Sequence, residues 1–309
     1  MNTFIRPPRL RPGDRVMLVA PAGPVPPDKL EIALARVRVL ELEPVLGNAV
    51  RQQNGYLAGP DSARAADLQR AIDDPDIAAI WAVRGGYGGM RTLQHVDLAG
   101  LVQRPRAFIG FSDNTVIHLA LARVGVVSFH GPHAGSEAFP AATTECFRRV
   151  LWAAEPAGRL PDSISGPEPV TLLGGIAQGP LAGGNLAMLA AACGTPWQLH
   201  ARGRIVAIED VGEPLYRIDR MLLQLRLAGA LEGAAGFVFG RFTDMPDDED
   251  EDDPSLADVL RAAIAPLQVP AVLGLPIGHA HENWTLPLGV QARLDADACT
   301  LTVLEPAVA

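Results

Sequence analysis

The sequence predicts an α/β protein with a parallel sheet in its first half and a mixed α/β arrangement in its second half. From Asp14 to Gly135, short apolar runs alternate with segments whose apolar residues have helical spacing. This alternation is typical of a parallel sheet with crossover helices. A Pro- and Gly-rich segment, Glu155–Pro169, then interrupts it and is the best linker candidate. We therefore expect an N-terminal α/β domain over residues 1–160 and a C-terminal mixed α/β domain over residues 161–309.

Each strand predicted in the first half is a short apolar run that ends at glycine, proline or a helix-capping residue. Asp28 and Asp61 are residues of the type that caps a helix N-terminus. The predicted strands are Asp14–Gly23, Ile77–Gly89 (which runs into a Gly-rich loop), Arg106–Ser112 and Gly125–Gly135. The predicted helices are Asp28–Glu43, Asp61–Ile77 and Val116–Val124.

The second half contains helices and strands in a less regular order. Gly179–Pro196 reads as a loop that enters an Ala-rich helix, and Tyr216–Gly233 is a strongly amphipathic helix with a glycine stop. The predicted strands are Gly203–Pro214 and Ala234–Asp244, followed by a strand, a loop and a terminal hairpin within Pro270–Glu305.

Composition and charge exclude several classes of protein. Hydrophobic residues make up 48% of the 309 positions and charged residues 20%, which allows a sizeable core and argues against global disorder. The formal net charge is −9, but one run, Asp247–Asp253, holds seven acidic residues, so the rest of the chain is nearly neutral. Without a basic stripe, nucleic-acid binding is not expected. Because like charges repel, we expect this run to be a solvated loop rather than a metal site.

The cysteines and the apolar runs indicate the cellular compartment in which we expect the protein. Three cysteines lie far apart without a CxxC motif, which predicts neither a disulfide framework nor a zinc site. No apolar run reaches the roughly 18 residues of a membrane span, and the first residues lack the apolar core of a signal peptide. We expect a cytoplasmic protein that does not contact the membrane.

Ser112 lies where a predicted strand meets a predicted helix, and two roles fit that position. Active sites of parallel sheets form beyond the carboxyl ends of the strands, where a turn residue projects out of the sheet. A serine there can act as a nucleophile, and the next backbone N–H, that of Asp113, can bind the oxyanion. The same serine can simply cap the helix. The stretch GFSDN departs from the G-x-S-x-G motif at Asn114, so this stretch alone favours the cap.

The Gly-rich stretch Arg84–Gly89 also has two interpretations. It matches neither the G-x-G-x-x-G pattern nor a P-loop, so it does not predict a nucleotide site. It is either a flexible turn or a backbone wall whose N–H groups approach a substrate closely. Its spacing does not decide between the two.

A serine nucleophile needs a base and an acid that orients it, and several residues qualify. Histidines at the ends of predicted strands are His130, His133, His279 and His281. Glu209 and Asp210 end an apolar strand, where a carboxylate either caps backbone groups or orients a base. His279-x-His281 lacks a third ligand in the sequence, so no metal site is predicted.

Seven segments, taken together and in order, resemble the LD-carboxypeptidase family of serine peptidases, which includes muropeptide carboxypeptidases and microcin C immunity proteins. The resemblance covers nearly the whole chain, and seven ordered segments are far more specific than any one motif. The segments are RPGDRVMLVAPAGPV, AVRGGYGGMRTL, FIGFSDNTVIHLAL, HGPHA, GPLAGGNLAMLAAACGTPW, IVAIEDVGEPLYRIDRMLLQL and GLPIGHAHENWTLPLGVQARLD.

The resemblance implies a Ser–His–Glu triad in a cleft between the two domains. The nucleophile falls on Ser112, the acid on Glu209 and the base on His279, although the spacing also allows His281 as the base. The oxyanion hole would use the N–H of Asp113 and one from Gly85 or Gly86. The resemblance also implies a homodimer that needs neither a metal nor a cofactor.

In carboxypeptidase members, the bond cleaved joins the L-centre of meso-diaminopimelate to a terminal D-alanine of a murein tetrapeptide, in peptidoglycan recycling. Candidate substrate-binding residues are Arg84, Tyr87 and Asn185, with a salt bridge as the alternative role of Arg84. Two further functions remain open. One is hydrolysis of a peptidyl- or aminoacyl-nucleotide amide, as in the microcin-type members, and the other is peptide binding without catalysis.

Overall fold

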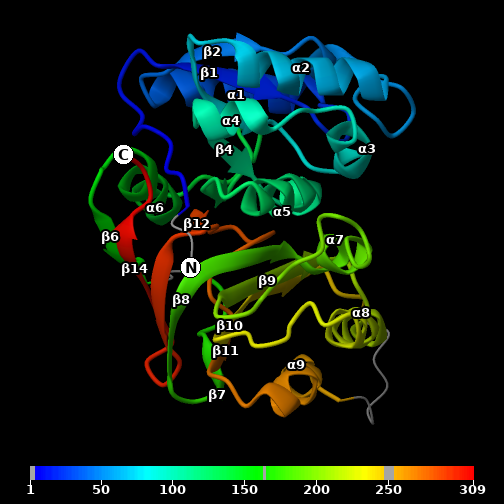
Figure 1. Cartoon of the computed structure of the whole chain (residues 1–309), viewed down its shortest axis with the longest axis vertical. Coiled ribbons are helices and arrows are strands. Elements are labelled where there is room, and N and C mark those ends of the chain that lie inside the picture. Colours follow the sequence, from blue (N-terminus) through cyan, green and yellow to red (C-terminus); the bar gives the residue numbers. More distant parts are fainter. Residues whose placement is uncertain (1–3, 163–164, 247–253) are drawn as a thin grey trace.

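Two β-sheets organise the chain, with the first half above and the second half below in Figure 1. The computed structural model describes residues 4–162, 165–246 and 254–309. In space the first sheet runs β12-β5-β4-β3-β1-β2, and every neighbouring pair is parallel except β12 with β5. Its strands are β1 (Arg15–Val19), β2 (Glu43–Leu46), β3 (Ile77–Ala82), β4 (Ala107–Gly110), β5 (Ser128–His130) and β12 (Leu286–Leu288).

Helices cover both faces of the first sheet because its strands are apolar on both faces. Alternate residues of β1 belong to different cores. Val16 and Leu18 pack with residues of α1 and α6, whereas Met17 and Val19 pack with residues of α2 and α5. The helices of this half are α1 (Pro27–Val39), α2 (Asp61–Asp73), α3 (Gly89–Leu93), α4 (Ala99–Gln103), α5 (Thr115–Arg123) and α6 (Ala141–Leu151), with short 3-10 turns η1 (Ala49–Arg51) and η2 (Ser112–Asn114).

The second sheet is mixed and runs β6-β14-β13-β8-β9-β10-β11-β7. Its four strands from β8 to β11 are parallel, and antiparallel strands flank them. The strands are β6 (Pro156–Arg159), β7 (Val170–Leu173), β8 (Ile176–Asn185), β9 (Ile205–Val211), β10 (Gly236–Thr243), β11 (Ala271–Leu273), β13 (Gln291–Asp295) and β14 (Thr300–Pro306).

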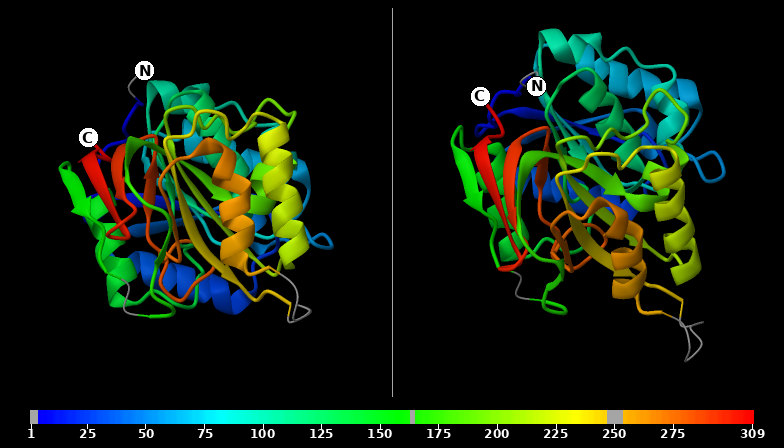
Figure 2. Two further views of the ribbon diagram at one scale, coloured as in Figure 1. Left: turned by 90° about the horizontal axis from the view of Figure 1, so that it is seen from below. Right: turned by 60° about the horizontal axis from the view of Figure 1, so that its bottom comes forward.

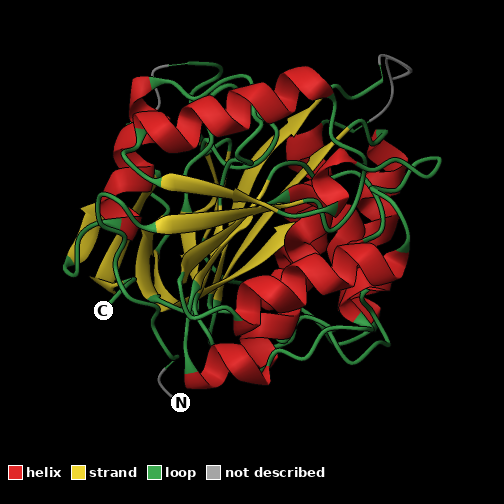
Figure 3. Ribbon diagram, turned by 90° about the horizontal axis from the view of Figure 1, so that it is seen from above, coloured by secondary structure: helices red, strands yellow, loops and turns green. Residues whose placement is uncertain are grey.

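In the described residues of the second half, the helices are α7 (Leu186–Ala191), α8 (Leu215–Leu227) and α9 (Leu256–Ile264), with a 3-10 turn η3 (Ala265–Leu267). Figure 2 shows α8 and α9 side by side on the outer face of the second sheet. Viewed from above, helices enclose the strands on both sides (Figure 3). The expected combination of a parallel α/β half and a mixed half is confirmed.

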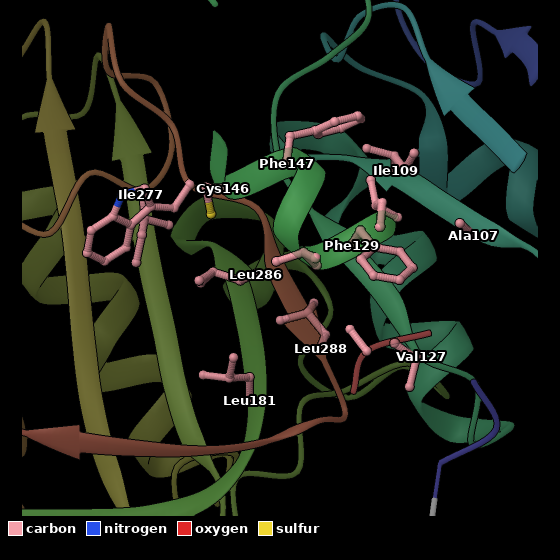
Figure 4. Packing of buried hydrophobic residues seen from close by; sticks show 14 of the residues in the cluster. Ala107, Ile109, Val127, Phe129, Cys146, Phe147, Leu181, Ile277, Leu286 and Leu288 are labelled. Carbon is pink, nitrogen blue, oxygen red and sulfur yellow. The ribbon is translucent and has the colours of Figure 1, made fainter. Parts of the chain in front are cut away.

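One strand crosses between the halves in each direction. β6 lies before residue 160 in the chain but pairs with β14 of the second sheet, and β12 comes from the second half but pairs with β5 of the first sheet. Figure 4 shows the core around this crossing, where Leu286 and Leu288 of β12 lie between Phe129 of the first sheet and Leu181 of the second. A single apolar cluster therefore joins the two sheets.

Four strand and helix predictions need correction. Gly179–Asn185 belongs to the ten-residue strand β8 rather than to a loop, because its glycines allow close approach: a Cβ on Gly179 or Gly183 would overlap the backbone at Gly203 or Ala207, before and in the adjacent strand β9. The helix predicted to reach Glu43 ends at Val39, since Glu41 adopts a φ of 62°, and β2 follows. The helix predicted to reach Ile77 ends at Asp73, and β3 begins at Ile77. The helix predicted to reach Gly233 ends at Leu227, since Gly229 adopts a φ of 71°. The helices and strands not predicted are α3, α4, α6, α9, β2, β6, β7 and β12.

The expected solvated loop at Asp247–Asp253 lies outside the described residues. None of the helices in the described part of the chain combines the length and apolar character needed to span a bilayer.

Candidate active site

Ser112 is held in a sharp turn between β4 and α5. Its φ is +60°, a left-handed conformation that costs a non-glycine residue about 1–2 kcal/mol. Asn114, where the G-x-S-x-G motif has its second glycine, closes the turn: its Nδ2 donates to the Phe111 carbonyl at 3.1 Å and lies 3.0 Å from His133 Nε2. The strained turn presents Ser112 at the carboxyl end of β4, which is the arrangement of an activated serine nucleophile.

The Gly-rich loop after β3 lies directly against this serine. A Cβ placed on Gly85 would lie 2.9 Å from Ser112 Oγ, and Gly86 has a φ of +107° that favours glycine. The loop is tied to the serine turn by Asp113, whose Oδ2 accepts a hydrogen bond from the Gly89 N–H at 2.6 Å. Burial raises the pKa of Asp113 to about 6, against the opposing effect of the backbone N–H groups of Gly89 and Gly88.

His279 lies in the loop that connects β11 of the second sheet to β12 of the first. Hydrogen bonds hold the middle of this loop: the Gly278 N–H donates to Asn283 Oδ1 at 3.0 Å, and Thr243 Oγ1 donates to the His279 carbonyl at 3.2 Å. The Asn283 N–H in turn donates to Thr143 Oγ1 of α6 at 3.1 Å. The loop is thus anchored to both halves of the molecule.

Glu209, on β9, binds the His279 ring at Nδ1. Its Oε2 lies 2.7 Å from His279 Nδ1, and its side chain is completely buried. Burial alone would raise the pKa of Glu209, but the neighbouring His130 and His279 outweigh it and lower the pKa to about 2. The carboxylate is therefore ionised, so His279 Nδ1 carries the proton of this hydrogen bond and Nε2 is left as the basic atom.

The same contact raises the pKa of His279. Burial acts to lower it, but the hydrogen bond and the charge of Glu209, together with the charges of Asp210 and Asp244, prevail. His279 is thus a stronger base than an isolated histidine. This pairing of a buried carboxylate and a partly exposed imidazole is what a general base requires.

Ser112 and His279 line one cavity with a volume of about 550 Å³. Residues of both halves form its walls, including Arg84, Gly85 and Gly86 from the first and Asp244 and Gly278 from the second. Within the described residues, no hydrogen bond joins the serine to the histidine, as is common before a substrate is bound. Of the three residues predicted as a triad, Ser112 and His279 therefore line one cavity. Glu209 lies behind His279, outside the lining, and is bonded to its ring.

The predicted substrate-binding residues occupy three different environments. Arg84 lines the cavity, and its Nη1 donates to the Pro24 carbonyl at 2.8 Å. Tyr87 is 53% exposed and contacts Tyr56 edge to face, and it does not line the cavity. Asn185 is buried away from the cavity, where its Nδ2 donates to Asp210 Oδ1 at 2.8 Å.

The remaining histidines have separate surroundings. His281 is exposed, whereas His279 alone of the two contacts Glu209. His133 lines the cavity wall, and burial lowers its pKa to about 3. His118 is bonded to Ser128 and Gly110, and burial lowers its pKa to about 3 as well. Among the described residues, no three histidine, cysteine or carboxylate side chains converge as metal ligands.

Sequence reasoning missed several residues of the site. Lys29 and Glu137 form an ion pair at 3.2 Å on the cavity wall, and Asp244 lines the cavity with a φ of +52°. His130 was expected at the rim, but it lies buried, with Nε2 3.8 Å from Glu209 Oε1. For His130, the position at the end of a predicted strand indicated a place near the site. Nothing in the sequence indicated that Lys29, Glu137 and Asp244 would line the cavity.

Comparisons with known proteins identify the family of this chain. Residues 16–131 match the model of the LD-carboxypeptidase N-terminal domain, and residues 178–294 match the model of the C-terminal domain. A putative carboxypeptidase of Streptomyces coelicolor is 42% identical, covering 100% of this chain and 99% of the relative. The chain belongs to the LD-carboxypeptidase family. The expected family membership is therefore confirmed.

Three named proteins extend the comparison. The murein tetrapeptide carboxypeptidase of Pseudomonas aeruginosa is 38% identical, covering 92% of this chain and 94% of the relative. The crystal structure of muramoyltetrapeptide carboxypeptidase from Oxalobacter formigenes has a TM-score of 0.81 at 31% identity, covering 94% of this chain and 97% of that one. The microcin C7 self immunity protein MccF in complex with glutamyl sulfamoyl guanosine has a TM-score of 0.85 at 22% identity, covering 98% and 99%, and shares the fold.

Proposed function

We propose that this member of the LD-carboxypeptidase family is a serine carboxypeptidase that removes the terminal D-alanine from a murein tetrapeptide. The observation that carries the proposal is the cavity shared by Ser112 and His279, with the 2.7 Å contact from His279 Nδ1 to Glu209 beneath it. The similarity to the murein tetrapeptide carboxypeptidase of Pseudomonas aeruginosa over nearly the full length supports the choice of substrate.

Acylation uses the three residues in sequence. His279 Nε2 accepts the Ser112 Oγ proton while Oγ attacks the carbonyl carbon at the L-centre of diaminopimelate. The negative charge passes to the carbonyl oxygen, which the Asp113 N–H and an N–H of Gly85 or Gly86 stabilise; one such donor contributes about 3 kcal/mol. The C–N bond then breaks, and the His279 proton passes to the leaving amine of D-alanine.

Deacylation repeats the sequence with water. His279 accepts a proton from water, the resulting hydroxide attacks the acyl ester, and Ser112 leaves with the proton returned by His279. Glu209 keeps Nδ1 protonated throughout, because its lowered pKa leaves the carboxylate ionised at neutral pH. No step draws on a metal or a cofactor.

The terminal carboxylate of the substrate needs a cationic partner in the cavity. Arg84 and Lys29 both line it, and a guanidinium can bind a carboxylate with two parallel hydrogen bonds. The Nη1 of Arg84 donates to the Pro24 carbonyl. This bond orients the guanidinium but leaves its positive charge without a counter-charge from that partner. Tyr87 lies next to Gly86 in sequence and would contact only the part of a substrate that extends outside the cavity.

The nucleotide-amide alternative has less support from this cavity. A nucleobase site usually offers an aromatic face. None of the four tryptophans lines the cavity, and Trp284 is buried elsewhere with 3% exposure. Phe111 is the aromatic residue of the lining other than histidine, and it is already in contact with the rings of His133 and His279.

Mass spectrometry of L-Ala-γ-D-Glu-meso-diaminopimelyl-D-Ala incubated with the protein tests the proposal. We expect loss of one D-alanine with the wild type and an intact tetrapeptide with a folded Ser112→Ala variant. An intact tetrapeptide with the folded wild type would contradict the proposal. Aminoacyl sulfamoyl nucleotides in a parallel incubation test the alternative, and inertness toward both would favour peptide binding without catalysis.

The proposed setting is peptidoglycan recycling in the cytoplasm, with the protein acting as a homodimer. Light scattering coupled to size exclusion gives the mass in solution, and a mass close to 32.7 kDa would contradict the dimer.

A further inference from the structure

The two oxygens of the Glu209 carboxylate have different surroundings. Its Oε2 is bonded to His279 Nδ1, whereas Oε1 has no hydrogen-bond partner among the described residues. The nearest polar group to Oε1 that forms an ion-pair contact is His130 Nε2, at 3.8 Å. The side chains of Glu209 and His130 are 0% and 1% exposed. A bare oxygen of a buried anion is costly, so this second histidine is the group that faces it.

His130 differs from the other buried histidine of its strand region. Both ring nitrogens of His118 are engaged, at 2.9 Å from Ser128 Oγ and 2.8 Å from the Gly110 carbonyl. Neither ring nitrogen of His130 has a hydrogen-bond partner in the described part of the chain, although its surroundings are equally buried. A buried imidazole is usually satisfied by hydrogen bonds, so His130 is not explained as a structural residue.

The position of His130 connects the acid to the nucleophile. His130 is the last residue of β5, and its backbone is in register with Gly110 of β4, two residues before Ser112. On its other side it is in register with Leu286 of β12, the strand that follows the His279 loop. Glu209 belongs to the second sheet, so the contact between His130 and Glu209 crosses from one sheet to the other.

We propose that His130 is a positioning residue that fixes the Glu209 carboxylate through Oε1. A carboxylate held only at Oε2 can rotate about its Cγ–Cδ bond, and each rotation lengthens the bond to His279. With an imidazole on each oxygen, the carboxylate keeps one orientation, and because His130 lies in the sheet of Ser112, the acid–base pair is kept in register with the nucleophile. This inference rests on the proposed triad and adds a fourth residue behind it.

The hydrogen bond between His279 and Glu209 gives a readout that does not depend on turnover. A proton shared by an imidazole and a buried carboxylate gives a far-downfield ¹H NMR resonance, and loss of the resonance in His279→Gln assigns it. We expect the apolar variants His130→Phe and His130→Leu to broaden or abolish this resonance. In the same variants kcat should fall about tenfold to a hundredfold, with KM within about twofold, which is the usual effect of removing a residue that orients a reacting group.

A conservative variant and a matched control complete the experiment. His130→Gln keeps an N–H donor of similar reach, so it should restore the resonance and most of kcat. If it behaves like the apolar variants, the proposed contact between residue 130 and Oε1 does not hold the carboxylate in place. His118→Gln removes an equally buried imidazole that does not contact Glu209, and it should keep the resonance whatever its melting temperature. Two apolar variants of different size guard against a failure of one to fold.

The outcomes separate this inference from the proposed function. Apolar variants that keep both the resonance and the wild-type kcat overturn the role of His130. If the wild type does not cleave the tetrapeptide, the proposed function fails, yet the resonance still shows whether His130 holds Glu209 in place.

Discussion

The two sides of the cavity are built by different means. On the side of the first sheet, the backbone is decisive: Ser112 has a positive φ, and Gly85 leaves room for the serine because it has no side chain. On the side of the second sheet, side-chain charge is decisive, since the buried Glu209 carboxylate sets the ionisation of His279. The proposed nucleophile therefore depends on local backbone shape and the proposed base on electrostatics, so different substitutions should disable each side.

The largest effect is expected at the base. His279→Gln removes the atom that accepts the serine proton, and kcat should fall about 10⁵- to 10⁶-fold, as for loss of the base in other serine hydrolases. His281→Gln, two residues away and exposed, is the matched control and should change kcat by less than about twofold. Steady-state hydrolysis of the tetrapeptide measures both. Comparable losses in the two variants would mean that the base has been misassigned.

A smaller loss is expected at the acid, and the neighbouring residue is its control. Glu209→Gln keeps the shape but loses the charge, so kcat should fall about 10³- to 10⁴-fold. Asp210→Asn removes a carboxylate whose pKa burial raises to about 6 and which binds Asn185, Ala187 and Val211 rather than the histidine. That variant should lower the free energy of unfolding by about 1–3 kcal/mol, seen as a lower melting temperature, while kcat falls tenfold at most. Equal kinetic losses would remove the distinction between the two carboxylates.

On the backbone side, Gly85→Ala should lower kcat about 10²- to 10³-fold, comparable with the loss of one oxyanion donor. The added methyl would lie 2.9 Å from Ser112 Oγ, so either the loop or the serine must move. Gly194→Ala, which has open space around its Cβ position, should reduce only stability, by about 1 kcal/mol. Unchanged kinetics in Gly85→Ala would show that the loop plays no part in the reaction.

The mildest test changes pH instead of sequence. His279 must be neutral to accept the serine proton, and its pKa is raised above 6.5, so kcat/KM should rise with pH through a midpoint above 6.5. In Glu209→Gln, the residual activity should have its midpoint at a lower pH, because the charge that raises the pKa is gone. Profiles of kcat/KM against pH for both proteins check this. If both proteins have the same midpoint, the group whose titration causes the rise of kcat/KM with pH is not His279.

The parallel first half and the strand-end positions of Ser112 and Glu209 were predictable, because short apolar strands and helical spacing are local signals. Strand β12 was not, since three residues carry no information about the sheet they join. The ten-residue strand β8 was taken for a loop because its glycines serve close packing rather than flexibility. Local sequence therefore identifies elements more readily than their partners.

The same limit applied within the site. The choice of His279 over His281 depended on family resemblance, and the structure supplies the contact that distinguishes them. Lys29 and Asp244 lie on elements far apart in sequence, so only the folded chain brings them to one cavity. The orientation of Asn185 toward Asp210 was equally hidden, because an amide that caps a helix and one that binds a ligand look alike in sequence.

The crossing of β12 has a consequence for synthesis on the ribosome. Translation proceeds from the N-terminus, so β1 to β5 emerge long before Leu286–Leu288, and until then the outer edge of β5 has no strand beside it. The first sheet is completed only after strands β6 to β11 of the second sheet have been made. Because β12 directly follows the loop that carries His279, the nascent polypeptide closes this sheet and delivers the proposed base in the same late event.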